Sequence, residues 1–528
     1  MMGLSIIFDL FLVECNIIVH QKLVNNKSFF HRFLPEILLI ALMGIILFSS
    51  VNHTHDWGGD FAQYLDNARD LITKANAPGD EVLDGINFAP ASRGAGFSLL
   101  IAPVYLLFGD AILHFTIFIS VFALLVTLIL FKFYQKSGLN TPLAFLLTLI
   151  FILNPATFQL KFEILPTFPF LALLYIIFIH KKAKSAKQLG LLALLVGCLI
   201  SIRNVGWVCY LSLFIHVLIS WVKHPVPKEL LKLMGFALIA PLTEMTIKWL
   251  VFGYATEENL SWYGSTFHLN DWSVFWDRLV YNYDQLLVFF KPTSMGTTGL
   301  TFGKLMIAIT FLGWGYRLYQ KHWGLADTFT LCYGLILLLY EGVSGIRFLI
   351  PVLPMALFYW IIGIIFLLSR LKEELANRIK LAFLTSFLLM TFPGTWTLLR
   401  QSQFPIAGPN TTEAQEAFDY IQQTLSEQEV TAFHKPWVFH YYTDRVSMPI
   451  NPKTGMKGFT MPYLVEKMKK YQVNHILVSI AEWDKVIYNS KLIHGIREDT
   501  RFIRQWQNES FALYSFEHNE NRKNPQME

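Results

Sequence analysis

The sequence predicts a polytopic α-helical membrane protein with a small α/β domain at its C-terminal end. The chain has 528 residues, of which 54% are hydrophobic and only 15% are charged, and its mean hydropathy is +0.42. Soluble domains contain roughly 25% charged residues, so the composition excludes both a soluble globular protein and a disordered one. Two further observations support this class: basic clusters alternate with apolar segments, and the last quarter of the chain is polar.

The apolar segments are numerous enough for about eleven membrane spans. A helix needs roughly 20 apolar residues to cross a bilayer. Cytoplasmic loops carry an excess of Lys and Arg, so the basic clusters, the densest at 181–187, place the stretches on the opposite side outside the cytoplasm. The expected spans cover about 33–51, 111–133, 141–158, 165–179, 189–202, 205–222, 233–254, 302–316, 328–341, 347–370 and 381–399.

This topology divides the chain into three parts. Residues 1–32 form an N-terminal cytoplasmic or interfacial segment, and residues 33–400 form a transmembrane domain with external loops at 52–93 and 255–298. Residues 401–528 have a soluble composition and form an extracytoplasmic α/β domain. Its expected elements are helices at 413–425 and 463–471 and strands at 430–433, 473–480 and 511–516.

Charge and cysteine content narrow the function further. The net charge is only +5, and the basic residues lie in short clusters between apolar segments, so they report topology and imply no nucleic-acid partner. The four cysteines all lie in apolar runs. A disulfide framework or a zinc site with CxxC spacing is therefore not expected.

Asp60 is the main candidate for a catalytic base. It follows Gly58 and Gly59, which permit a tight turn, and it precedes a helix expected over 61–72 in the first external loop. A carboxylate at the mouth of a membrane cavity is suited to take a proton from an acceptor hydroxyl or amine. The alternative is that Asp60 only caps this helix.

Two arginines near the outer ends of apolar segments are candidates for binding a phosphate. Arg93 directly precedes Gly94, and Arg347 precedes Pro351 and Pro354, which distort a helix. A guanidinium group presents a planar fork of donors that matches a phosphate. The alternative is that each arginine extends toward lipid headgroups.

Four segments, in order along the chain, resemble motifs of one family: 59–71, 91–109, 163–170 and 347–354. The first reads GDFAQYLDNARDL and is similar to the pattern (D/G)(D/E)xxxYxxxAxxL, and the last reads RFLIPVLP and is similar to R(Y/F)LLPLLP. The family is the C-type superfamily of polytopic glycosyltransferases, particularly the branch of protein O-mannosyltransferases and bacterial aminoarabinose or mannose transferases. The resemblance covers the whole membrane part.

The resemblance implies transfer of a sugar from a polyprenyl-phosphate carrier to an acceptor at the outer face of the membrane, with inversion at the anomeric carbon. It implies that Asp60 acts as the general base. It also implies that Arg347, helped by Arg93 or Arg203, binds the donor phosphate. Members often have two acidic residues where this chain has Asp60 and Phe61, so only Asp60 matches the acidic position.

Substrate and metal ligands follow from the same resemblance. Tyr64, Asp56 and Glu163 are the expected substrate-binding residues. No cofactor is required, because guanidinium groups can neutralise the leaving phosphate. A divalent metal held by His53 and His55 is a further hypothesis, since some relatives are metal-dependent; the alternative is a surface loop with two ordinary histidines.

The expected partners are a polyprenyl-phosphate-linked sugar, a lipid, glycan or protein acceptor, and membrane lipids. The compact loops favour a bacterial inner membrane, with the active site facing the periplasm and a role in the cell envelope. Two alternatives stay open: a glycan polymerase or ligase with a polyprenyl-diphosphate donor, and a non-catalytic lipid or sugar transporter. A transporter often has repeated halves and charges at the bilayer midplane, and the sequence shows neither feature.

Overall fold

The computed structural model describes eleven stretches of the chain, which form two compact units. The first unit comprises Met1–Asn52 and Ser92–Phe404, and the second comprises His53–Ala91 and Pro405–Glu528. The first external loop therefore belongs to the same unit as the C-terminal domain. The described residues are 26–58, 60–73, 94–180, 185–223, 227–252, 272–340, 345–402, 404, 406–450, 460–480 and 490–518.

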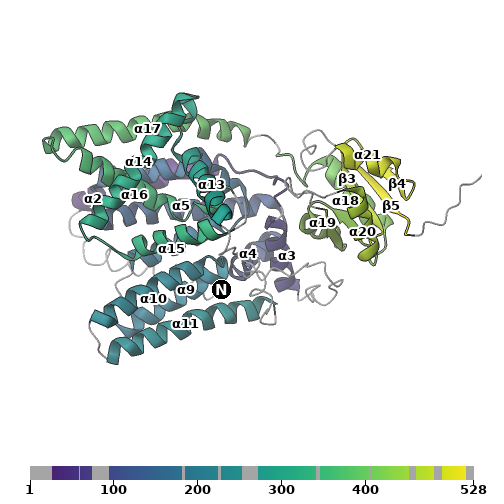
Figure 1. Ribbon diagram of the computed structural model, residues 1–528, viewed down its shortest axis with the longest axis horizontal. Coiled ribbons are helices and arrows are strands. Elements are labelled where there is room, and N and C mark those ends of the chain that lie inside the picture. Colours follow the sequence, from purple (N-terminus) through teal and green to yellow (C-terminus); the bar gives the residue numbers. More distant parts are fainter. Residues whose placement is uncertain are drawn as a thin grey trace, which may run out of the picture. The chain divides into compact units, whose positions relative to one another are not determined.

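The first unit is helical, and Figure 1 shows its helices α9, α10 and α11 side by side. Its helices are almost uniformly apolar, as expected where helices contact lipid or the interior of a bundle. They are α2 (Asn26–Phe48), α4 (Ala95–Phe108), α5 (Ile112–Lys136), α6 (Thr141–Ile152), α7 (Pro155–Phe158), η2 (Gln159–Phe162), α8 (Thr167–Ile179), α9 (Ala186–Ile202), α10 (Gly206–Lys223), α11 (Pro227–Phe252), α13 (Trp272–Phe290), η3 (Thr293–Met295), α14 (Thr298–Tyr319), α15 (Leu325–Leu339), η4 (Ile346–Phe348), α16 (Leu353–Leu367) and α17 (Glu373–Gln401).

Within the described stretches, three helices are long and apolar enough to cross a membrane: α5, Met234–Val251 of α11, and α17. A fourth candidate is the pair Thr141–Ile152 and Pro155–Phe162, which is bent by 60°. The bend falls at Pro155, because proline has no N–H to continue the preceding helix. The described stretches also contain shorter apolar helices of 10–17 residues, and the total of about eleven spans stays a prediction.

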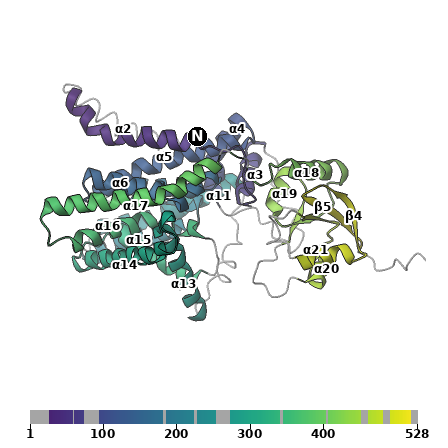
Figure 2. The ribbon, with the colours of Figure 1, turned by 90° about the horizontal axis from the view of Figure 1, so that it is seen from above.

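A buried carboxylate joins three helices of the first unit. Asp327, near the start of α15, accepts hydrogen bonds from the Tyr359 hydroxyl of α16 (2.8 Å) and from Arg317 Nη2 of α14 (3.1 Å). Asp327 is only 2% exposed, and a buried charge costs free energy unless it is paired. The network therefore fixes the register of the three helices, which lie side by side in Figure 2.

Helices α14 and α16 approach so closely that each needs a glycine at the crossing. A Cβ atom at Gly313 would overlap the carbonyl oxygen of Tyr359, and one at Gly363 would overlap that of Ile309. Small residues at a helix crossing let the two backbones come into contact.

The second unit is a three-layer α/β/α sandwich. Its five-stranded sheet has the order β2-β1-β3-β5-β4, in which β2, β1 and β3 are parallel and β5 and β4 are antiparallel to their neighbours. Figure 2 shows α18 and α19 on one face of the sheet and α20 and α21 on the other. The elements are α3 (Asp60–Thr73), α18 (Thr412–Thr424), β1 (Thr431–Phe433), α19 (Pro436–Thr443), β2 (Ser447–Pro449), α20 (Met461–Lys470), β3 (His475–Ser479), α21 (Ser490–Glu498), β4 (Phe502–Gln507) and β5 (Phe511–Phe516).

Successive side chains along a strand point to opposite faces of the sheet, so each strand contributes to the packing on both faces. Val430, Ala432, Ile476 and Val478 face the core that α20 and α21 cover, whereas Phe433 faces the opposite side. The predicted helices 413–425 and 463–471 and the three predicted strands are confirmed.

One expectation needs correction. The stretch 255–298, expected as an external loop, contains α13 (Trp272–Phe290) in its second half. The sequence there mixes Trp, Tyr, Asp and Asn with apolar residues, which obscured a helix that buries Leu287, Phe289 and Phe290. Residues 255–271 lie outside the described stretches.

We expect Gly313→Ala to destabilise the first unit, because the added methyl group overlaps backbone that cannot move without separating α14 from α16. Overpacking of this kind typically costs about 1–3 kcal/mol. The measurement is the thermal unfolding midpoint in detergent. Gly315→Ala is the matched control, because it lies in the same helix and its added Cβ meets open space. Equal midpoints for the two variants would contradict the close crossing.

Candidate functional site

The structure distributes the predicted site residues between the two units. Asp60 and the residues predicted around it, His53, His55, Asp56 and Tyr64, belong to the second unit. Arg203, Glu163 and Arg347 belong to the first unit. Arg93 lies outside the described stretches, so its predicted role as a phosphate ligand stays a prediction.

Asp60 is the first residue of α3 and is exposed. The helix behind it is largely buried, with Phe61, Leu65 and Ala68 fully buried and Tyr64 only 9% exposed. The expected helix over 61–72 is therefore confirmed within Asp60–Thr73. A carboxylate in the first turn is favoured by the positive end of the helix dipole, so this position suits both a cap and an ionised base.

The turn before Asp60 is anchored in the C-terminal domain by Trp57. This side chain is 7% exposed, and its ring centroid lies 5.9 Å from the ring centroids of Phe433 and Phe511 and 6.4 Å from that of Phe418. Aromatic pairs at such distances add stabilisation beyond burial alone. The loop that carries Asp60 therefore folds as part of the aromatic core of the α/β domain.

The same loop carries the two histidines of the metal hypothesis, and they differ in exposure. His55 is 2% exposed, its ring stacks on Phe61 with centroids 3.9 Å apart, and its Nδ1 lies 3.0 Å from Asp56 Oδ1. His53 is exposed. Among the described residues, no group of three or more His, Cys, Asp or Glu side chains lies close enough together to hold a metal ion, and the divalent metal at His53 and His55 stays a hypothesis.

In the first unit, two of the predicted phosphate-binding arginines lie against one ring. The ring centroid of Phe348 is 5.6 Å from Cζ of Arg203 and 5.7 Å from Cζ of Arg347. Arg203 follows the last residue of α9, and Arg347 lies in η4. The Tyr333 hydroxyl donates a 2.6 Å hydrogen bond to the Phe348 carbonyl, which holds η4 against α15.

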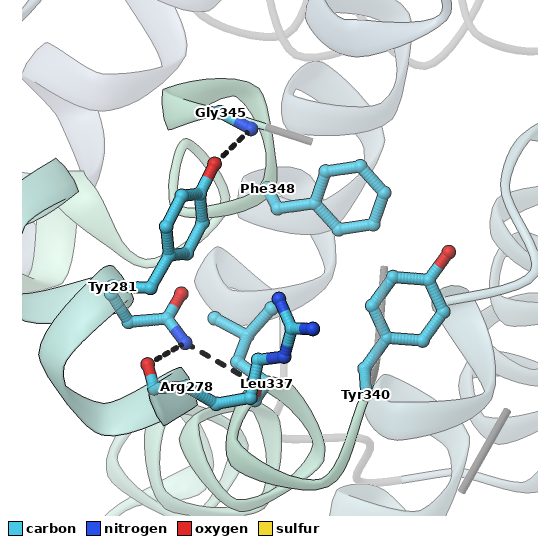
Figure 3. Close-up of a pocket in the computed structure, with 7 residues that line it drawn as sticks. Arg278, Tyr281, Leu337, Tyr340, Gly345 and Phe348 are labelled. Carbon is cyan, nitrogen blue, oxygen red and sulfur yellow. Dashed lines mark hydrogen bonds between the residues drawn. The ribbon is translucent and has the colours of Figure 1, made fainter. Parts of the chain in front are cut away.

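A third arginine, which the sequence analysis missed, points to the same place. Arg278 of α13 lines a cavity of about 10 Å³ together with Tyr340, Gly345 and Phe348, and Figure 3 shows its guanidinium group directed between the Tyr340 and Phe348 rings. The Tyr281 hydroxyl accepts a 2.8 Å hydrogen bond from the Gly345 N–H. The cavity has room for about one water molecule.

Two of these arginines, Arg203 and Arg278, have a buried donor atom without a hydrogen-bond partner among the described residues. The two atoms are Arg203 Nη1 and Arg278 Nε. Buried polar groups are normally hydrogen-bonded, and an unmatched charged donor is costly. Two such donors near one short helical turn are suited to binding an anion.

Glu163, a predicted substrate ligand, is partly buried and ends η2. Its neighbour Lys161 is 1% exposed and donates hydrogen bonds to the carbonyl oxygens of Leu47 (2.9 Å) and Ser50 (2.8 Å). Lysine at a helix C-terminus satisfies carbonyls that lack a partner in the helix. Lys161 therefore fixes the end of α2, from which the loop to Asp60 departs.

A cluster of charged side chains lies farther along α3. Arg69 Nη2 contacts Asp66 Oδ1 (2.5 Å) and Asp444 Oδ1 (2.8 Å). Burial raises the pKa of Asp66. Burial, and then the charge of Asp66, raise the pKa of Asp70 to about 7.

Comparison with solved structures defines the fold. No family model and no curated protein matches the sequence. ArnT from Cupriavidus metallidurans bound to undecaprenyl phosphate matches with a TM-score of 0.57 and 12% identity, over 93% of this chain and 99% of that one. The apo state of the same protein matches with a TM-score of 0.52 and 10% identity, over 91% of this chain and 98% of that one. The Archaeoglobus fulgidus oligosaccharyltransferase, tethered with an acceptor peptide, matches with a TM-score of 0.50 and 11% identity, over 93% of this chain and 75% of that one.

The chain therefore has the fold of the C-type polytopic glycosyltransferases. The resemblance inferred from its motifs is confirmed at the level of the fold, and the chain is an integral membrane protein. At 10–12% identity, the likeness defines the fold and not the role of any residue.

We expect Asp70→Asn to stabilise the protein more at high pH than at low pH. In the unfolded chain Asp70 ionises near its ordinary pKa of 3.8, whereas in the folded protein its pKa is about 7. The unfolding free energy therefore falls as pH rises between these values and stays lower above them. The measurement is the unfolding midpoint of both proteins at about pH 5 and about pH 8. A midpoint difference that does not change with pH would contradict the raised pKa.

Proposed function

We propose that this chain is a membrane glycosyltransferase that transfers a sugar from a polyprenyl-phosphate carrier to a lipid, glycan or protein acceptor, with inversion at the anomeric carbon. The observation that carries the proposal is that Arg203 Nη1 and Arg278 Nε are buried without a hydrogen-bond partner among the described residues, and that both side chains, like Arg347, lie near Phe348. The fold adds support, because the ArnT structure that shares it holds undecaprenyl phosphate.

On the donor side, the arginines bind the phosphate that links the sugar to the lipid. When the bond between the anomeric carbon and the phosphate oxygen breaks, the electron pair leaves with the phosphate and increases its negative charge. Guanidinium groups in a site with little water stabilise this charge far more than they would in water. Arg203, Arg278 and Arg347 are the residues proposed for this role, and no step requires a metal.

On the acceptor side, Asp60 is the proposed general base. It takes a proton from the acceptor hydroxyl or amine while the oxygen or nitrogen attacks the anomeric carbon from the face opposite the phosphate. A single displacement of this kind inverts the anomeric configuration. Tyr64, Asp56 and Glu163 are proposed to contact substrate.

The proposed location is the inner membrane of a bacterium, with Asp60 facing the periplasm. The basic clusters support this orientation, because they place the first external loop opposite the cytoplasm. The α/β domain follows the last apolar helix and lies on the same side by the same argument.

We expect Asp60→Asn to lower sugar transfer by about 10²–10⁴-fold, the usual contribution of a general base. The measurement is release of free polyprenyl phosphate by detergent-purified protein, given a panel of polyprenyl-phosphate sugars and a membrane-glycan extract as acceptor. Asp110→Asn is the matched control, because Asp110 is an exposed carboxylate in another external turn.

Two results would change the proposal. Wild-type transfer by Asp60→Asn would remove Asp60 from the role of base. If the wild type releases no lipid phosphate from these donors but does act on lipid-diphosphate oligosaccharides, the donor is a polyprenyl diphosphate and the protein is a polymerase or ligase.

A further inference from the structure

Helix α19 of the C-terminal domain contacts helix α3 through a small network of charged side chains. Arg69 of α3 contacts Asp444 at the end of α19, with 2.8 Å between Nη2 and Oδ1. It also donates a 3.4 Å hydrogen bond to the Tyr441 carbonyl, and its Cζ lies 5.5 Å from the centroid of the Tyr441 ring. One side chain of the helix that begins with Asp60 thus makes three separate contacts with one short helix of the α/β domain.

Asp66 of α3 makes a second contact between α3 and α19. Asp66 is 6% exposed, and its two oxygens are shared between Arg69 (2.5 Å) and His440 Nε2 (3.4 Å). Removing either partner would leave a buried carboxylate with fewer contacts, which is costly. Helix α3 can therefore leave α19 only if this carboxylate loses a partner.

The backbone conformation of Asp444 is one that favours glycine over residues with a side chain. Asp444 follows the last residue of α19 with φ of 52°, in the left-handed region. Glycine adopts this conformation without strain and is the usual residue after a helix. An aspartate here gives up that advantage, and its carboxylate is the group that reaches Arg69.

We propose that the C-terminal α/β domain positions the catalytic carboxylate, and that Arg69 and Asp444 are positioning residues for Asp60. The inference rests on the proposed function, because it assigns Asp60 the role of base. We call the contacts among Arg69, Asp66, His440 and Asp444 the clasp. Through the clasp, the α/β domain sets the orientation of α3, although α3 lies more than 300 residues earlier in the sequence.

The test is Asp444→Asn in the full-length protein. Asparagine tolerates the left-handed conformation and leaves Arg69 paired with Asp66, so the fold is retained while one contact of the clasp is weakened. We expect kcat for sugar transfer to fall by about 10- to 100-fold, as small misplacements of a catalytic group do, with KM for the lipid donor unchanged. Arg69→Lys keeps the charge but loses the planar fork of donors. We expect its kcat to lie between the kcat of the wild type and that of Asp444→Asn.

The control is Asp499→Asn. Asp499 pairs with Arg501 (2.6 Å) in the same domain, and neither residue belongs to the clasp, so its loss should leave kcat unchanged. Equal kcat losses in both variants would mean that general destabilisation, and not positioning, is the cause. Wild-type kcat in Asp444→Asn, alongside an inactive Asp60→Asn, would overturn the positioning role and leave the proposed function standing.

A second readout does not depend on activity. Amide hydrogen exchange of α3 (Asp60–Thr73) should be faster in Asp444→Asn than in the wild type and unchanged in Asp499→Asn. If the wild type transfers no sugar from any donor, the proposed function fails while this measurement still decides whether the clasp holds α3. Unchanged exchange in Asp444→Asn would overturn the clasp.

Discussion

The proposed donor site depends on the buried guanidinium groups that lie around Phe348. Arg203 and Arg278 each keep a buried N–H without a partner in the described part of the chain, and such a donor costs about 1–3 kcal/mol or more when it is charged. In the proposed function, the phosphate of the donor satisfies these donors and offsets the cost. Hydrogen bonds between the Tyr333 and Tyr281 hydroxyls and the backbone of Phe348 and Gly345 hold the turn η4 (Ile346–Phe348), which carries Arg347 and the Phe348 ring.

The second organising feature is that one loop is folded with a distant domain. Trp57 lies among the aromatic side chains of the α/β domain, and Arg69 pairs with Asp444. The proposed base therefore belongs to the same unit as the α/β domain, whereas the proposed phosphate ligands Arg203, Arg278 and Arg347 belong to the other unit. In the proposed mechanism this separation matches the chemistry, because the acceptor arrives from outside and the donor from the bilayer.

Much of the fold could be predicted from local pattern. Apolar runs, basic clusters and the helix after Asp60 are set by neighbouring residues, and the structure has helices at these places. The grouping of 53–91 with the C-terminal domain could not be predicted, because the contacts of Trp57 and Arg69 join residues more than 350 positions apart and leave no local signal.

Arg278 was missed for a different reason. The sequence assigned its surroundings to a loop, since Asp277, Asn282 and Asp284 interrupt the apolar residues of α13. The available signal was the spacing of Phe275, Arg278, Asn282, Leu286 and Phe289, which lie three or four residues apart, as on one face of a helix. Asp60 and Arg347 were predicted because short motifs surround them, and their roles stay predictions.

The most direct test of the central claim is a structure of the full-length protein with undecaprenyl phosphate bound. The account predicts a phosphate within about 3 Å of guanidinium nitrogens of Arg203, Arg278 or Arg347, the distance of a charge-assisted hydrogen bond. A phosphate bound elsewhere, with Arg203 Nη1 and Arg278 Nε still unsatisfied, would contradict it.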